Sequence, residues 1–196
     1  MINLTRRQQE IVTAALKLIS EGGIQDLTMK NLAKSLGVTE PALYRHFKNK
    51  HEILSRVLSF LGENMREIFR RATELPLDPL ERIRRVFQRH FEVFEKNPAL
   101  AVILFSEGLF QLEGSLLEQV KGIMEYSRKR FVAFIEEGQS SGTIRADIPS
   151  CQLALILMGT LRLHVLRWKL NLFSFNLKEE GDLLWSSLEK ILKATE

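Results

Sequence analysis

The chain has 196 residues, of which 45% are apolar and 27% charged. A chain of this size and composition buries roughly 70% of its unfolded surface, which excludes a disordered tail, a collagen-like fibre and a disulfide-stapled mini-protein. Residues 1–50 hold eight of the 28 Lys and Arg residues and four of the 24 Asp and Glu residues, so the whole net charge of +4 lies in this first quarter. Such a basic segment indicates a polyanionic partner, either nucleic acid or an anionic membrane surface.

Helix-start signals recur along the whole chain. A Ser, Thr, Asn or Asp side chain at the N-cap accepts a hydrogen bond from a backbone N–H that has no partner inside the helix. At most of these positions an acid, a glutamine or a proline follows in the first turn, and an apolar run of period 3.6 comes behind it. The nine positions are Thr5, Thr28, Thr39, Asn49, Asp78, Asn97, Ser115, Ser150 and Asn176.

Glycines mark several helix ends. Gly22 and Gly23 end the first helix, Gly37 ends the second, and residues 138–142 end a long helix that starts near Ser115. Residues 143–147 could be extended, but the segment is short and isolated. The sequence therefore predicts an all-α protein of about nine helices.

Residues 28–47 predict a helix-turn-helix. Leu32 and Leu36 lie on one apolar face, Gly37 permits a tight turn, and Leu43 and Phe47 anchor the next helix inward. The outward face of the second helix then carries side chains that suit base edges in the major groove: Glu40, Ala42 and Arg45, with Thr39 and Tyr44 beside them. Any corner between two helices shares this spacing, so the spacing leaves a purely structural role open.

The surrounding residues resemble a known family. Glu21-Gly22-Gly23, Leu27-Thr28, Leu32-Ala33, Gly37-Val38 and above all the run from Ala42 to Lys50, ALYRHFKNK, are similar to the TetR family of transcriptional repressors. The resemblance covers residues 6–54 closely. Beyond them only the helix count and turns such as 142–147 correspond.

The resemblance implies a role for each matching residue. Tyr44 and Thr28 would contact the DNA backbone, and Lys50 would hold a phosphate at a helix N-terminus. For His46 two roles stay open, a contact to a phosphate and local packing. The full set of expected DNA-binding residues is Thr28, Thr39, Glu40, Ala42, Tyr44, Arg45, His46, Lys48 and Lys50.

The neutral remainder, residues 51–196, is rich in phenylalanine. In the TetR family such residues line a ligand pocket, although for each single residue an aromatic core is the simpler explanation. A pocket with this lining would take a small apolar or aromatic ligand. The candidate lining residues are Phe87, His90, Phe91, Phe94, Phe105, Phe110, Met124 and Phe131.

The helix that starts near Ser150 is apolar on almost every side, and the last helix carries a second apolar stripe. A helix buried all round needs partners on two faces, which a chain of this size hardly supplies. We therefore expect a homodimer, and the resemblance implies a four-helix bundle of these two helices from each subunit. The candidate interface residues are Leu155, Gly159, Arg162, Leu184, Leu188 and Ile191.

A membrane-bound, secreted or enzymatic protein finds little support in the sequence. Met1 to Gln9 is polar, and the longest apolar stretch, 153–161, has nine residues where a spanning helix needs about 20. The single Cys151 agrees with a reducing compartment, and packing explains it more simply than redox sensing. No metal-binding, nucleophile-elbow, P-loop or dinucleotide motif is present, so we expect a cytoplasmic protein that is not an enzyme and needs no cofactor or metal.

Together these observations predict two functional parts. Residues 1–50 form a DNA-binding head, with the helix-turn-helix at 28–47, and residues 51–196 form a ligand-binding and dimerisation body. The predicted function is that of a homodimeric repressor that binds a palindromic operator on double-stranded DNA and is released by a small apolar ligand. The alternative is a DNA-bound scaffold of the same fold that has no inducer.

Overall fold

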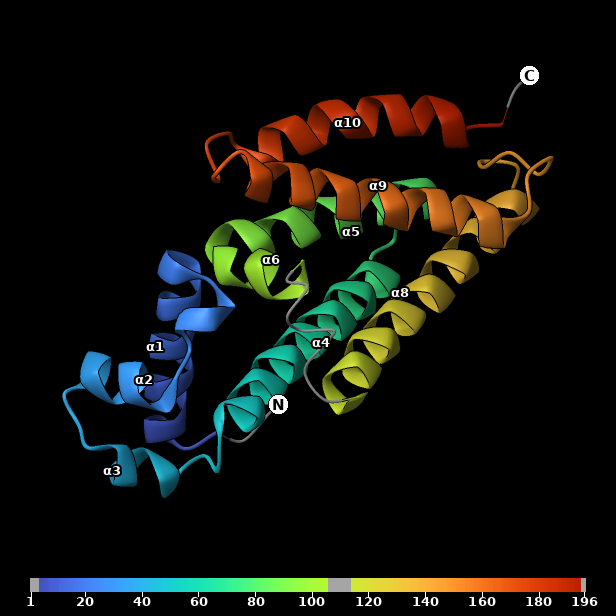
Figure 1. Cartoon of the computed structure of the whole chain (residues 1–196). Helices are drawn as coiled ribbons and strands as arrows, with labels where there is room; N and C mark the ends of the chain where they lie inside the picture. Colours follow the sequence, from blue (N-terminus) through green and yellow to red (C-terminus); the bar gives the residue numbers. More distant parts are fainter. Residues whose placement is uncertain (1–3, 106–113, 195–196) are drawn as a thin grey trace. The chain divides into compact units, whose positions relative to one another are not determined.

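The computed structural model describes residues 4–105 and 114–194, and this part of the chain is helical almost throughout (Figure 1). Its nine α-helices confirm the all-α prediction, with a single isolated β-bridge between Ile144 and Lys193. The helices are α1 (Arg6–Gly22), α2 (Met29–Leu36), α3 (Glu40–Tyr44), α4 (Lys50–Glu74), α5 (Pro79–Lys96), α6 (Pro98–Leu104), α8 (Gly114–Ser140), α9 (Ser150–Leu170) and α10 (Leu177–Leu192).

The predicted helix starts agree with the structure to within two residues. Asn176 caps α10 as expected, since its side chain accepts from the backbone N–H groups of Lys178 and Glu179. Two details differ. Ser115 is the second residue of α8 rather than its cap, and Pro149 takes the cap position of α9, so that Ser150 is the first helical residue. A short 3₁₀-helix, η1 (Ile24–Asp26), was not predicted.

The chain divides into two compact units, which we describe separately: Met1–Glu63 with Asn97–Lys121, and Asn64–Lys96 with Gly122–Glu196. The first unit contains α1, α2, α3 and the beginning of α4, together with α6 and the first turns of α8. Helix α1 packs on both α2 and α6. The core of this unit is built from side chains at helical spacing, namely Ile11, Ala15, Ile19, Leu32, Leu43, Phe47 and Leu54, all of which are buried.

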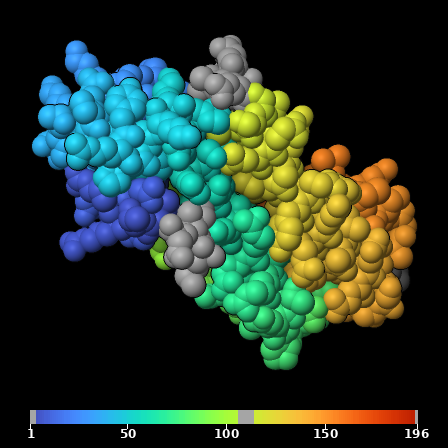
Figure 2. Space-filling model, turned by 90° about the horizontal axis from the view of Figure 1, so that it is seen from below, coloured from blue at the N-terminus to red at the C-terminus, as the bar shows by residue number. Residues whose placement is uncertain are grey.

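The second unit has an aromatic core. Phe69 of α4 meets Phe131 of α8 edge to face at 5.0 Å between ring centroids, and Phe87 of α5 meets Trp185 of α10 at 5.4 Å. Figure 2 shows the atoms of α4 and α8 side by side. Between these two helices the Arg130 side chain donates to the Thr73 hydroxyl at 2.6 Å. Among the remaining helices of this unit, α10 packs on both α5 and α9.

Gly181 sets the approach of α10 to α5, because a Cβ at this position would overlap the ring of Phe91. We expect Gly181→Ala to lower the free energy of unfolding by about 1–3 kcal/mol, since neither backbone nor ring can give way cheaply. Urea denaturation followed by circular dichroism measures this. The matched control is Gly122→Ala in α8, where a Cβ meets no atom within 4 Å. That variant should gain stability from helix propensity, up to about 1 kcal/mol. Equal behaviour of the two variants would contradict the packing argument.

Candidate nucleic-acid interface

The turn between α2 and α3 is fixed by two local features. The Thr28 hydroxyl accepts from the backbone N–H of Asn31 at 3.0 Å and caps α2. Gly37 ends the helix in the left-handed conformation, with φ of +65°, and the backbone N–H of Val38 then donates to the carbonyl of Ala33 at 3.0 Å. This closed turn, which glycine adopts without steric cost, brings the chain directly into α3.

Helix α3 is anchored on one side and open on the other. Leu43 and Phe47 are each 1% exposed, and the backbone N–H of Phe47 donates to the Leu43 carbonyl at 3.0 Å. Tyr44, by contrast, is 50% exposed, and Arg45 is exposed beside it. Thr39 occupies the N-cap without using its side chain as a cap. Its hydroxyl is therefore not committed to the helix.

The start of α4 is held by a reciprocal pair of side-chain caps. Asn49 Oδ1 accepts from the backbone N–H of Glu52 at 2.9 Å, and Glu52 Oε2 accepts from the backbone N–H of Lys48 at 2.8 Å. This arrangement places Lys48 just before the positive end of the helix and Lys50 at its first residue. Ammonium groups and helix dipole act together there on any anion, such as a phosphate.

The basic residues around α3 keep their charge available. Across residues 4–105 and 114–194, no carboxylate lies within 4.0 Å of the basic groups of Lys30, Lys34, Arg45, Lys48 or Lys50. Helix α1 differs, because Arg7 and Arg6 both pair with Glu10, at 2.7 and 3.5 Å. The hydrogen bond from Arg7 keeps the pKa of the Glu10 carboxyl below its ordinary value. The cations available for a polyanion are thus those of α2, α3 and the α3–α4 turn.

Each predicted DNA-binding residue lies in the first unit, at the start of α2, on α3 or between α3 and the start of α4. Four of them are exposed: Thr39, Tyr44, Arg45 and Lys48. Five are half-buried: Thr28, Glu40, Ala42, His46 and Lys50. The carbonyl of His46 accepts from the Gln8 amide of α1 at 3.4 Å, which links this turn to the first helix.

Two contacts between α4 and α8 were not foreseen. Ser115 Oγ and His51 Nε2 lie 2.9 Å apart, and the Gln119 amide donates to the Ser55 hydroxyl at 2.7 Å. Both pairs join residues 64 positions apart, at successive turns of the two helices. No sequence signal could have revealed them, because single polar residues on a helix surface are ordinary.

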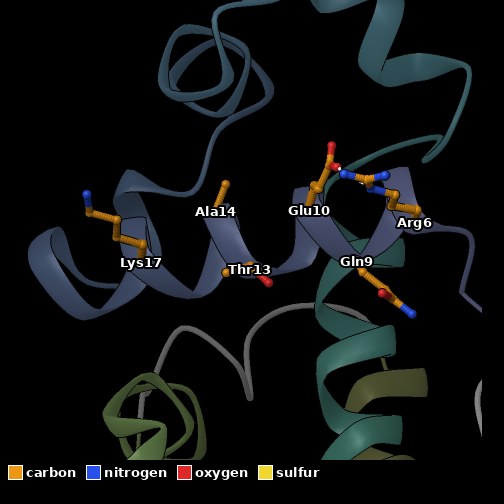
Figure 3. A pocket seen from close by; sticks show the side chains of 6 residues that line it. All are labelled: Arg6, Gln9, Glu10, Thr13, Ala14 and Lys17. Carbon is orange, nitrogen blue, oxygen red and sulfur yellow. Dashed lines mark ion pairs between the residues drawn. The ribbon is translucent and has the colours of Figure 1, made fainter.

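A shallow hollow also lies on the surface of α1 (Figure 3). It is lined by one face of that helix: Arg6, Gln9, Glu10, Thr13, Ala14 and Lys17. Its one carboxylate is already paired with arginine, as the dashed line in Figure 3 marks. This hollow adds no candidate to the predicted set.

The geometry of this unit, a helix-turn-helix followed by a basic helix start, agrees with comparisons to known proteins. Residues 11–57 match the family model of the bacterial regulatory proteins of the tetR family, and residues 59–190 match the model of the C-terminal region of YsiA-like proteins. The chain belongs to the TetR family. It is thus a DNA-binding transcriptional regulator, and the resemblance drawn from the sequence is confirmed.

Similar proteins include regulators and one nucleoid protein. Nucleoid occlusion factor SlmA of Vibrio atlanticus is 27% identical over 190 residues, covering 96% of this chain and 97% of SlmA. The transcriptional repressor KstR2 of Mycolicibacterium smegmatis is 25% identical over 142 residues, 72% of this chain and 69% of the repressor. The KstR2 structure from Mycobacterium tuberculosis superimposes with a TM-score of 0.84 at 21% identity, covering 98% of each chain.

One solved neighbour contains a ligand. FadR from Bacillus subtilis in complex with stearoyl-CoA has a TM-score of 0.75 and 24% identity, covering 92% of this chain and 96% of FadR. At this identity the likeness concerns the fold.

The predicted pocket residues of this TetR-family regulator fall into different environments. Phe87, Phe91, Phe94 and Phe131 are buried in the second unit, at 2% exposure or less. His90 is half-buried against Phe94, with 5.0 Å between ring centroids, whereas Met124 is 43% exposed. Phe105 is half-buried in the first unit, and Phe110 lies outside the described residues.

The predicted interface residues are mostly exposed on the second unit. Leu155, Gly159, Arg162 and Ile191 are exposed, and Leu184 is half-buried. Leu188 is 3% exposed because it packs inside its own protomer. Additional apolar side chains share the open face, notably Leu163 at 65% and Leu183 at 68% exposure.

Neither a membrane span nor a metal cluster is found in the described ranges. None of their helices is long and apolar enough to cross a membrane. Within the same ranges no three His, Cys, Asp or Glu side chains are grouped so that they could hold a metal ion.

His90 makes the stability of this regulator sensitive to acid. Burial lowers the pKa of its imidazole to about 4. Because the unfolded side chain titrates near pKa 6.5, the unfolded state binds the proton first, and stability is lost as the pH falls from about 6.5 toward 4. Between about pH 7 and pH 5 the free energy of unfolding should fall by about 1–2 kcal/mol more in the natural protein than in His90→Gln. Urea titrations at both pH values measure the difference, and an equal loss in both proteins would rule His90 out as the cause.

Proposed function

We propose that this chain represses transcription as a homodimer, binding a palindromic operator through two basic heads and leaving it when a small apolar ligand binds the body. The observation that carries the proposal is the open face of α3 and the α3–α4 turn. There Arg45, Lys48 and Lys50 have no carboxylate partner among the described residues, on a chain that belongs to the TetR family. Repression follows if the bound dimer excludes polymerase from the promoter.

In the proposed complex α3 enters the major groove. Arg45 would donate two hydrogen bonds to a guanine, Glu40 would accept from a cytosine, and Ala42 would touch a thymine methyl group. Lys50, at the first residue of α4, would bind a phosphate without regard to sequence. Two heads related by a two-fold axis read two half-sites about 34–36 Å apart or a little more.

The proposed dimer uses the open faces of α9 and α10. Leu155, Leu163 and Leu183 are each about two-thirds exposed, at 66%, 65% and 68%. Exposed leucines concentrated on two neighbouring helices are typical of a protein–protein interface rather than of a free surface. The proposed interface retains Leu155, Gly159, Arg162, Leu184 and Ile191, adds Leu163 and Leu183, and leaves out the buried Leu188.

The assignment of residues 1–50 as the head and 51–196 as the body concerns function and stays a proposal. The first compact unit reaches further, since it includes α6 and the first turns of α8. The hydrogen bonds of His51 and Ser55 to α8 lie beside Lys50 on the same helix. They offer a physical connection through which a displacement of α8 would move the phosphate-binding end of α4.

An apolar ligand is supported by the aromatic character of the body and by the FadR neighbour, which forms a complex with stearoyl-CoA. A ligand releases DNA only if it binds one state of the dimer better than the other, here the state in which the heads are wrongly spaced. A long-chain acyl-CoA is the first probe to use, with CoA as the control for its polar part.

Footprinting on the DNA upstream of the chain's own gene tests the proposal. We expect protection of a palindrome, a dimer of 22.6 kDa chains in sedimentation, and release of the DNA by stearoyl-CoA but not by CoA. Failure to retard any upstream fragment would overturn the repressor proposal. Protection that persists with every ligand tried would overturn only the proposal that a small ligand releases the DNA.

The scaffold alternative is favoured by one observation, the 27% identity to SlmA over 96% of the chain. A scaffold would use DNA to position a protein partner and would need no inducer. Thermal unfolding in the presence of a metabolite panel separates the two functions. An induced repressor shows a rise in melting temperature with at least one compound, and a scaffold shows none.

A further inference from the structure

His164 of α9 is the only polar or charged residue that is buried in the described part of the chain, at 6% exposure. Its Nε2 atom is enclosed and has no hydrogen-bond partner. The imidazole meets two phenylalanine rings, with centroid distances of 5.1 Å to Phe91 of α5 and 5.9 Å to Phe175 of the α9–α10 turn. A buried nitrogen without a partner is costly, so this position calls for an explanation.

The α9–α10 turn, residues 171–176, closes in a strained conformation. Leu172 and Phe173 have φ of +51° and +60°, in the left-handed region that disfavours bulky side chains. Ring contacts oppose this strain, since the Phe173 ring lies 4.7 Å from that of Trp168, and Trp168 Nε1 donates to the carbonyl of Phe175 at 2.9 Å. The closed turn therefore depends on the packing of its rings, and opening it costs less than unfolding the helices beside it.

Phe175 connects His164 to this turn. Its ring packs on the imidazole and also lies under the guanidinium of Arg167, at 5.1 Å. That guanidinium pairs with the Glu180 carboxylate at 3.5 Å. None of the charged or titratable groups around His164 reaches Nε2 within hydrogen-bonding distance. These groups are Arg167 on its own helix, Lys178 and Glu180 on α10, and His90, Glu92 and Glu95 on α5.

A proton on His164 would place a charge among these rings and leave Nε2 without an acceptor. Burial accordingly holds the pKa of the His164 imidazole below its ordinary value, and the backbone of Leu177 opposes this only in part. In an open turn, where water reaches the ring, the side chain titrates near pKa 6.5. The closed turn is therefore fully stable above about pH 6.5 and loses stability as the pH falls below that value.

We propose that the α9–α10 turn is an acid-sensitive switch, in which protonation of His164 releases Phe175 and opens the turn. The unpartnered Nε2 favours the neutral imidazole in the closed state. Phe175 links the imidazole to the turn, and the two left-handed residues lower the cost of opening. All of these contacts lie within one protomer, so the switch depends on neither the proposed dimer nor the proposed ligand.

Hydrogen exchange of the turn amides tests the switch in the full chain at pH 7 and pH 5.5. The backbone N–H of Phe173 donates to the carbonyl of Trp168 at 2.9 Å, so this amide reports the closed turn. After correction for the intrinsic exchange rate, its protection should fall roughly five- to eightfold between the two pH values. His164→Gln keeps a neutral polar side chain and should abolish most of this fall. His164→Leu repeats the measurement if glutamine lowers the stability of the protein at pH 7.

His90→Gln is the matched control, because His90 is the other imidazole of this unit and its ring lies against Phe94. This variant should retain the full fall in protection at the turn. An equal fall in the natural protein and in both His164 variants would assign the acid response to other groups and overturn the switch. Turn amides that exchange only as fast as the interior amides of α5 would also overturn it, because the turn would then open only with the whole unit.

Leu172→Asn separates the strain from the proton. Asparagine tolerates the left-handed backbone, and the leucine side chain is 85% exposed, so little packing is lost. Protection of the turn amides should rise roughly fivefold at both pH values, while the ratio between the two values stays the same. Unchanged protection at both pH values would overturn the role of backbone strain in keeping the turn close to opening.

Discussion

Replacing Arg45 with alanine is expected to lower affinity for the operator by roughly 10- to 100-fold, because a bidentate contact to guanine contributes about 1–3 kcal/mol of discrimination. Arg45 closes α3 as its C-cap residue and is exposed, with no carboxylate in reach among the described residues. Its loss should therefore leave the fold intact and relax the base preference at one position of each half-site. Titration of the natural operator and of variants at that position by fluorescence anisotropy measures both effects.

Lys50→Ala provides the contrasting case. A phosphate contact carries no sequence information, so this variant should weaken binding to all sequences alike and reduce the slope of log affinity against log salt by about one. Lys129→Ala, which removes an exposed cation from α8 in the second unit, is the control for net charge. If Arg45→Ala weakened every sequence by the same factor, Arg45 would be a phosphate contact and its proposed base-reading role would be wrong.

The sequence predicted the helices well because their signals are local. Thr28 caps α2 through an atom three residues away, and Gly37 ends the helix by its own conformational freedom. Neither feature depends on the rest of the chain. The helix-turn-helix could therefore be located, and its inward residues Leu43 and Phe47 assigned, before any tertiary contact was known.

Tertiary contacts decided what the sequence left open. The packing of α6 on α1 and the contact of His51 with Ser115 join segments that are far apart in sequence, and both partners look like ordinary helix residues. On α10, Leu184 and Leu188 occupy one stripe, yet Leu188 is buried and Leu184 half-buried in a helix that packs on both α5 and α9. The sequence pattern alone does not distinguish these two positions.

The aromatic residues of the body are a second case, because the sequence allowed both a pocket and a core for them. Phe87 is 1% exposed, and its ring meets those of Phe91, Phe131 and Trp185 at 5.4–6.2 Å. Three ring contacts at edge-to-face angles fill the space around it, as in a packed interior. Phe87→Ala is therefore expected to lower the free energy of unfolding by about 3–5 kcal/mol, more than Gly181→Ala.

Urea unfolding at fixed protein concentration measures this effect, because dimer formation would add a concentration-dependent contribution. Met124→Ala is the matched control among the predicted pocket residues, since Met124 is 43% exposed and should change the stability by less than about 0.5 kcal/mol. A side chain that lines an empty pocket makes fewer packing contacts than one in the core. Its truncation to alanine therefore lowers the free energy of unfolding by less. A small loss of stability in Phe87→Ala, together with weaker binding of stearoyl-CoA, would move Phe87 from the core to the pocket.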